Sequence, residues 1–304
     1  MGHLEPMQAG EKVLILGVTG AIGRGLPALF AARGMEVTGV SRSANPWVHG
    51  VSHWQHPERL DVAGFDVVVN LAGEPVAKRW TDANKKKFYD SRVGLTARLV
   101  EAIGRLEKSQ RPRVLINASA VGYYGDRSDE ELTESSSLGE GYLAELCRDW
   151  EAAAKPVEDM GVRLVMLRVG VVLGRGADAW EKLSGVLKTG LGGPLGNGRQ
   201  WMPWIHIDDI RGAILHAAGS ESLKGPVNGS APTPERNDAL SRKIAAAFNR
   251  PALLPAPGFG LRLIVGGFAS ALLASHRVLP KALLDDGYEF RHPTLEKALV
   301  DLVG

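Results

Sequence analysis

The sequence predicts an α/β protein with a doubly wound parallel sheet and a small C-terminal lobe. Short β-branched runs alternate with amphipathic helical segments over the first two thirds of the chain. A glycine-rich turn joins the first strand to the first helix. After about residue 170, glycine and proline become frequent and strands become sparse. We therefore expect a core over residues 12–170, and over 171–304 a lobe that is interleaved with the last core strands.

The first strand, Val13 to Leu16, runs into a turn with three glycines at spacing three. In such a turn one glycine allows the tight bend, one lets the backbone approach a pyrophosphate, and one lets helix and strand pack closely. We expect a helix from Ala21 to about Arg33, with the pyrophosphate at its N-terminus, where free N–H groups and the helix dipole favour an anion. The turn predicts a dinucleotide site formed by Gly17, Thr19, Gly20, Ala21, Ile22 and Gly23.

The segment Glu36 to Val40 is predicted to be the second strand, and the residues after it indicate which dinucleotide binds. An acidic side chain at this point would bind the ribose hydroxyls of NAD and repel a 2′-phosphate. The chain has Ser41, Arg42 and Ser43 instead, which can pair with that phosphate and hydrogen-bond to it. We therefore expect NADP (NADPH) to bind in preference to NAD. A solvated loop arginine is the alternative for Arg42.

The remaining elements follow in order. Strands are expected at 66–70, 113–117 and 162–169. Thr81 is expected to cap a long helix that ends near Leu106, and a helix over 142–160 should kink at Pro156. A helix over 210–218 would be capped by Asp208.

Composition narrows the function. Lys and Arg number 36 against 34 Asp and Glu, which gives a net charge of +2, and no basic stripe is interleaved with aromatic residues. We therefore expect neither a nucleic-acid nor a membrane partner. Cys147 is the only cysteine, which excludes an intrachain disulfide, and the N-terminal residues lack the features of a signal peptide. We expect a cytoplasmic protein that acts on a small molecule, with a homodimer left open.

Seven motifs carry a resemblance to a known family: GVTGAIG, NLAGEPVAKRW, DSRVGLT, NASAVGYYG, LRVGVVLG, MPWIHIDD and GYEFRHPTLEKAL. The chain resembles the extended and atypical short-chain dehydrogenase/reductases, and most closely the epimerase family, which is related to the sugar-nucleotide epimerases. The likeness covers about residues 12–302. It implies a Rossmann fold that binds NADP and a lobe that binds a small substrate. It also implies further cofactor contacts from Leu71, Ala72, Gly73, Ser119, Val169 and Gly170.

The resemblance also implies where catalysis would occur. Members of the superfamily use a Ser or Thr after the fifth strand and a Tyr-x-x-x-Lys whose lysine lowers the pKa of the tyrosine. Here the helix offers no lysine: one register pairs Tyr142 with Leu146, and the other pairs Leu143 with Cys147. An unassisted phenol titrates near pH 10, about three pH units above neutrality. The catalytic candidates are Ser119, Tyr123 and Tyr142, with Tyr124 beside them, and packing is the alternative for Tyr142.

Basic and aromatic residues predict the substrate site, where they would clamp an anion against an apolar wall. A solvated loop is the alternative for Lys78 and Arg79. We interpret His206 as a residue that orders the lobe, and the histidines show no metal-ligand spacing, so no metal is expected. The substrate-binding candidates are Lys78, Arg79, Trp80, Arg92, Arg199 and Trp201.

Two classes of function remain. The first is an NADP-dependent oxidoreductase or epimerase that acts on a small polar substrate. The second is a binding protein that kept the nucleotide site and lost the chemistry, such as a cofactor-sensing or cell-division-linked regulator. Ser119 and the neighbouring tyrosines favour the enzyme, whereas the missing lysine favours the regulator. We prefer the enzyme.

Overall fold

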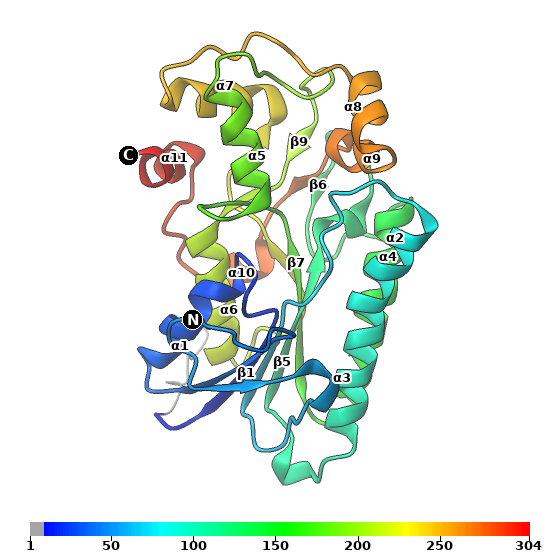
Figure 1. The fold of residues 1–304 in the computed structure, drawn as a ribbon, viewed down its shortest axis with the longest axis vertical. Helices are drawn as coiled ribbons and strands as arrows, with labels where there is room; N and C mark the ends of the chain where they lie inside the picture. The colour runs from blue at the N-terminus through cyan, green and yellow to red at the C-terminus, as the bar shows by residue number, and fades with distance from the viewer. Residues whose placement is uncertain (1–8) are drawn as a thin grey trace.

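The computed structural model describes residues 9–304, and a seven-stranded parallel sheet with helices on both faces forms its centre (Figure 1). The strand order is β3-β2-β1-β4-β5-β7-β11, and it reverses direction between β1 and β4, where ligands bind in such sheets. This confirms the predicted doubly wound α/β fold. The strands are β1 (Lys12–Leu16), β2 (Glu36–Val40), β3 (His53–Gln55), β4 (Val67–Asn70), β5 (Val114–Ala120), β7 (Arg163–Val169) and β11 (Gly225–Gly229).

The central strands are apolar on both sides because helices cover both faces of the sheet. In β1, Val13 and Ile15 pack with residues of α1 and α6, whereas Leu14 and Leu16 pack with residues of α3 and α4. All four side chains are buried. The two helix pairs are α1 (Leu26–Ala31) with α6 (Ile207–Gly219), and α3 (Leu95–Gly104) with α4 (Tyr142–Ala154).

The lobe lies at the upper end of the molecule in Figure 1, and three short strand pairs lie outside the central sheet. The pairs are β8 (Val171–Leu173) with β10 (Trp204–His206), β9 (Trp201–Met202) with β12 (Glu235–Arg236), and β6 (Glu131–Leu132) with β13 (Arg277–Val278). No helix among the described residues is long and apolar enough to cross a membrane. The other helices are α2 (Asp82–Tyr89), α5 (Asp178–Leu187), α7 (Asn237–Ala247), α8 (Gly258–Val265), α9 (Phe268–Leu273), α10 (Lys281–Asp285) and α11 (Leu295–Val303).

Three predicted helices differ from the structure. The glycine turn continues as a 3₁₀ turn, Gly23–Gly25, so the first helix begins only at Leu26 and ends at Ala31. The helix capped by Thr81 is interrupted by a π-helical turn, Asp90–Gly94, which separates α2 from α3. Such turns insert one extra residue per turn and often mark functional sites.

The third difference concerns α6, which begins at Ile207 and is capped by His206 rather than by Asp208. The Nδ1 atom of His206 accepts a hydrogen bond of 3.2 Å from the backbone N–H of Asp208. The predicted kink at Pro156 is confirmed, because α4 ends at Ala154 and a 3₁₀ turn, Lys155–Val157, follows.

The glycine turn gives the first testable prediction. A Cβ atom on Gly23 would lie 2.4 Å from the carbonyl oxygen of Gly17, so Gly23→Ala should destabilise the protein by about 1–3 kcal/mol. Gly185 lies in α5 with open space around it, so the control Gly185→Ala should be neutral or stabilise by up to about 1 kcal/mol. Urea unfolding measures both changes. Equal stabilities of the two variants would contradict the close packing of the turn.

Candidate functional site

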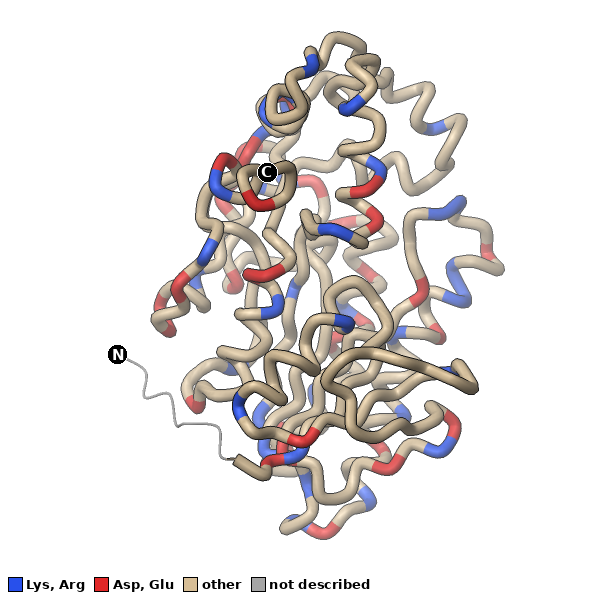
Figure 2. The backbone as a smooth tube through the Cα atoms, turned by 60° about the vertical axis from the view of Figure 1, so that its left-hand side comes forward, with Lys and Arg blue, Asp and Glu red and all other residues tan. Residues whose placement is uncertain are grey.

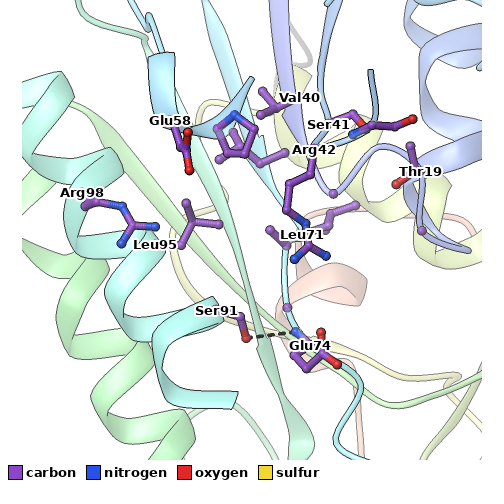
Figure 3. Close-up of a pocket in the computed structure, with 17 residues that line it drawn as sticks. Thr19, Val40, Ser41, Arg42, Glu58, Leu71, Glu74, Ser91, Leu95 and Arg98 are labelled. Carbon is purple, nitrogen blue, oxygen red and sulfur yellow. Dashed lines mark hydrogen bonds between the residues drawn. The ribbon is translucent and has the colours of Figure 1, made fainter. Parts of the chain in front are cut away.

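A cavity of about 1000 Å³ lies along the carboxyl ends of β1, β2 and β4 (Figure 3). It brings together eight of the residues that the sequence analysis assigned to the cofactor. Its location at the reversal of the strand order is the position expected of a dinucleotide site. The predicted residues that line it are Gly17, Thr19, Gly20, Ser41, Arg42, Leu71, Ala72 and Gly73.

The glycine turn forms the floor of this cavity. Gly17 has a φ of +77°, and a Cβ atom there would lie 2.7 Å from the carbonyl carbon of Leu71. Within residues 9–304, the N–H groups of Ala21 and Ile22 donate to no protein acceptor. Free N–H groups at the start of a helical turn suit a pyrophosphate, so the residues present fit a bound dinucleotide.

Two guanidinium groups line the same cavity, and neither forms a salt bridge with a described residue. Arg42 follows β2, whereas Arg98 lies on α3. Figure 3 shows Arg42 reaching toward Leu71 and Glu74 and Arg98 lying beside Leu95 on the other side. The sequence analysis missed Arg98, although its position three residues after Leu95 on one helix face could have indicated it.

A second cavity of about 210 Å³ adjoins the first, because Leu71 lines both. One face of α4 forms its wall, since residues at positions i, i+3, i+4 and i+7 share a helix face. Its lining is mainly apolar, with Arg92 as its charged member. The lining residues are Ile22, Leu71, Val76, Arg92, Ala118, Ser119, Ala120, Leu143, Leu146, Cys147, Trp150 and Val169.

The residues that line this cavity distinguish the two possible positions of the Tyr-x-x-x-Lys motif on α4, which are Tyr142 with Leu146 and Leu143 with Cys147. Leu143 and Cys147 both line the cavity, whereas Tyr142 does not. The Tyr142 hydroxyl donates to the carbonyl oxygen of Lys85 at 3.4 Å, and its ring centroid lies 5.0 Å from that of Trp80. Burial raises the pKa of Tyr142, and it raises the pKa of the Cys147 thiol to about 12. The geometry therefore disfavours Tyr142 as a proton donor and favours its packing role.

The other catalytic candidates belong to a buried network around Arg168. Ser119 donates its hydroxyl proton to Oε1 of Glu151 at 2.7 Å, and Arg168 binds both Glu151 oxygens at 2.8 Å. Arg168 also donates to the Tyr124 hydroxyl at 3.0 Å and lies 3.5 Å from the ring centroid of Tyr123. Burial raises the pKa of Tyr124 to about 12. Neither tyrosine lines a described cavity, so the geometry does not bring them to the cofactor site.

Arg92 is the member of the predicted substrate set that lines the second cavity. It lies in the π-helical turn Asp90–Gly94, where its Nη1 donates to the carbonyl oxygen of Glu74 at 2.8 Å. Its guanidinium lies 5.2 Å from the ring centroid of Trp150. Burial lowers the pKa of Arg92, and no described carboxylate forms an ion pair with it. A cation is thus presented to an apolar cavity without a counter-ion.

The remaining substrate candidates line neither cavity, and two of them contact α8 and α9 of the lobe. Arg79 donates to the carbonyl oxygen of Leu263 at 2.6 Å, and Trp80 packs edge-on against Phe268. Lys78 pairs with Glu74. The other two lie elsewhere in the lobe. Arg199 is exposed. The guanidinium groups of Arg236 and Arg277 lie 4.5 Å and 5.1 Å from the Trp201 ring centroid, and the indole N–H donates to Asp129 at 2.8 Å.

Three predicted cofactor residues also line neither cavity: Ala21, Gly23 and Gly170. Ala21 accepts a hydrogen bond of 2.7 Å from Arg211, and a Cβ atom on Gly170 would lie 2.1 Å from the carbonyl oxygen of Pro203. The two glycines therefore serve close packing, and the carbonyl of Ala21 holds Arg211. Ile22, Ser119 and Val169 contribute to the second cavity instead of the first.

His206 lies in a cluster with Asp208, His292 and Asp301, whose ligand-type atoms lie within 4.8 Å of one another. Because Nδ1 of His206 accepts a backbone N–H, its ring proton resides on Nε2, which lies 3.3 Å from Oδ2 of Asp301. The His206 and His292 ring centroids are 3.8 Å apart, with the ring planes tilted by 39° to each other. This geometry fits a residue that orders the lobe.

The fold and the two cavities define an NAD(P)-binding protein of the short-chain dehydrogenase/reductase type. Residues 13–228 match the profile of the NAD dependent epimerase/dehydratase family, and residues 256–302 match a domain of unknown function, DUF1731. The chain belongs to this epimerase family.

The relatives cover almost the whole chain. The human epimerase family protein SDR39U1 is 36% identical over 297 residues, which cover 96% of this chain and 99% of the relative. An epimerase family protein of Mycobacterium tuberculosis is 38% identical over 298 residues, which cover 96% of this chain and 97% of the relative. The crystal structure of human SDR39U1 (isoform 2) with NADPH superimposes with a TM-score of 0.89 at 35% identity, covering 96% of this chain and 99% of that one.

The cofactor cavity gives the second prediction. NADPH should bind at least tenfold more tightly than NADH, roughly the effect of one charge-assisted contact. Arg42→Asp should abolish or reverse this preference, because a carboxylate repels the 2′-phosphate. Calorimetric titration with both nucleotides measures the ratio.

A milder change at Arg98 tests the residue that the sequence analysis missed. Arg98→Gln should weaken NADPH more than NADH, whereas Arg105→Gln, at the exposed end of the same helix, should change neither affinity. Equal affinities for the two nucleotides in the unmodified protein would show that both guanidinium groups are merely solvated.

Proposed function

We propose that the protein is an NADP(H)-dependent oxidoreductase that transfers a hydride to or from a small anionic substrate. The unpaired guanidinium of Arg92, in an apolar cavity that adjoins the nucleotide cavity, carries this proposal. A cation beside apolar walls is costly unless an anion neutralises it. A carboxylate or another oxyanion is therefore the ligand group that this cavity favours.

The choice of NADP over NAD rests on the side chains after β2. Arg42, Ser41 and Ser43 take the place of the acid that binds ribose hydroxyls, and Arg98 adds a second cation. The NADPH in the structure of human SDR39U1 supports the same choice.

The chain's own residues have separable tasks in the proposed reaction. When bound, NADP(H) supplies or accepts the hydride. The N–H groups of Ala21 and Ile22 would hold the pyrophosphate, Leu143 and Leu146 would pack against the apolar part of the substrate, and Arg92 would orient the anion. Since Ser119 donates its proton to Glu151, we assign proton exchange to solvent water.

A catalytically inactive NADPH-binding regulator is the second candidate. One observation favours it: Leu143 and Cys147 occupy the cavity-lining register in which the superfamily carries its tyrosine and lysine. A regulator would still use the anion site, because it would respond to the anionic ligand and the cofactor when both are bound. Turnover distinguishes the two candidates.

We also propose that the protein acts in the cytoplasm. The single cysteine, Cys147, is buried and free, which suits a reducing compartment. A relative from Arabidopsis thaliana, 35% identical over 300 residues, is described as chloroplastic, so the compartment differs among family members.

The third prediction concerns Arg92. Malonate or oxamate should bind to the NADP-loaded protein at least tenfold more tightly than to Arg92→Gln, because the variant loses its charge-assisted contact. The affinity for NADPH should stay within about twofold in this variant, since Arg92 does not line the nucleotide cavity. Arg148→Gln, an exposed change on α4, is the matched control.

A turnover assay completes this test. A panel of 2-hydroxy and 2-oxo acids should include a substrate whose oxidation or reduction is followed through NADPH absorbance, and Arg92→Gln should lose that activity. Binding of the anion without any hydride transfer would favour the regulator. Equal anion binding by the unmodified protein and the variant would contradict both candidates.

A further inference from the structure

Helix α8 exposes its apolar side chains. Five of its eight residues are Phe, Leu, Ile or Val, yet none of its residues is buried. Phe259 and Leu263 lie four residues apart and share one side of the helix, and Ile264 follows directly. The backbone is fixed from beneath, because Arg79 donates to the carbonyl oxygen of Leu263 and Trp80 packs against Phe268 of α9.

Further exposed apolar side chains lie on the loop that precedes α8 and on the segment that packs against this loop. The loop crosses the top of the molecule in Figure 1 and lies against residues 190–196, where Leu195 forms a bridge with Ala256. Contiguous exposed apolar patches on soluble proteins usually mark a contact site. We name as the α8 surface the six side chains that are 56–73% exposed here: Leu191, Leu253, Leu254, Phe259, Leu263 and Ile264.

The stretch of chain that contains α8 carries basic residues and no acidic ones. No Asp or Glu occurs between Asp238 and Asp285, although this stretch contains six Lys and Arg residues. Four of the six pair with acids outside the stretch, whereas Arg250 and Arg262 form no salt bridge within residues 9–304. Figure 2 shows more blue than red along the chain at the upper end of the molecule. The chain-wide net charge of +2 conceals this local imbalance.

We infer that the α8 surface docks on a bilayer that contains anionic lipids, in contrast to the expectation from the chain's overall charge that there is no membrane partner. Interfacial helices combine exposed Phe and Leu side chains with basic residues that contact the headgroups. Arg262 stands between Leu261 and Leu263 on α8, and Arg250 precedes the exposed leucines of the loop. The anionic surface of a bilayer complements both charges. The protein thus lies on the membrane and does not cross it.

A second copy of the chain fits this surface less well. A two-fold symmetric contact brings each patch against itself. Such a contact through α8 would place Arg262 near its own counterpart, with no acid in the stretch to neutralise either guanidinium. An anionic partner therefore has the better charge complementarity.

Vesicle flotation tests this inference with the full chain. The protein should bind vesicles of phosphatidylcholine with 30% phosphatidylglycerol at least tenfold better than vesicles of phosphatidylcholine alone, and added salt should weaken the binding. Leu263→Glu and Ile264→Glu should each reduce binding to the anionic vesicles at least fivefold. The matched control is Val300→Glu, because Val300 is equally exposed but lies on α11.

Three outcomes would overturn the inference: no binding to anionic vesicles, equal binding to both vesicle types, or unchanged binding by the two α8 variants. A dimer in solution that Leu263→Glu dissociates, without vesicle binding, would assign the surface to a second copy instead. NADPH binding by each variant shows that its fold is intact. The result is independent of the proposed reaction, because no residue of the α8 surface lines either cavity.

Discussion

The buried ion pair between Glu151 and Arg168 organises the centre of this protein. It joins α4 to β7, and through Ser119 and Tyr124 it also holds β5 and the turn that follows β5. Both charged side chains are almost fully buried, so each requires the other. Because Glu151 lies on α4, the pair also fixes the rotation of that helix about its axis. The residues that α4 presents to the second cavity follow from this rotation.

This constraint decides which residues of α4 face the second cavity, whereas the difference from the superfamily lies in the residue types at those positions. With α4 held in this rotation, Leu143 and Cys147 face the cavity and Tyr142 packs against Trp80. Arg168 is buried and Arg92 is half-buried, and their guanidinium groups have different partners. A carboxylate binds that of Arg168 in a bidentate manner, whereas only carbonyl oxygens accept from that of Arg92 among the described residues. The unpaired cation is the one that borders the cavity, which is why a ligand and not a protein group is expected to neutralise it.

The structural features that depend on neighbouring residues could be predicted from the sequence, whereas those that depend on contacts between distant segments could not. The doubly wound α/β class, the glycine turn, the Thr81 cap and the kink at Pro156 follow from patterns along the chain, and the structure has them. Other features depend on packing between segments far apart in the chain. They are the π-helical turn that directs Arg92, the register of α4, and the pairing of Ser119 with Glu151. Arg79 and Trp80, which the sequence assigned to the substrate, contact α8 and α9, and these contacts also depend on segments far apart in the chain. The role of every site residue remains a prediction.

A double-mutant cycle on Glu151 and Arg168 tests the central claim most directly. Removing one partner leaves the other buried and unpaired, so Glu151→Gln and Arg168→Met should each lower the free energy of unfolding by about 3–5 kcal/mol. The double variant should be more stable than the sum of the two losses implies, because it leaves no unpaired charge. Urea unfolding of the four proteins measures this coupling. Losses below about 1 kcal/mol that simply add would contradict the account, since independent sites show no interaction energy.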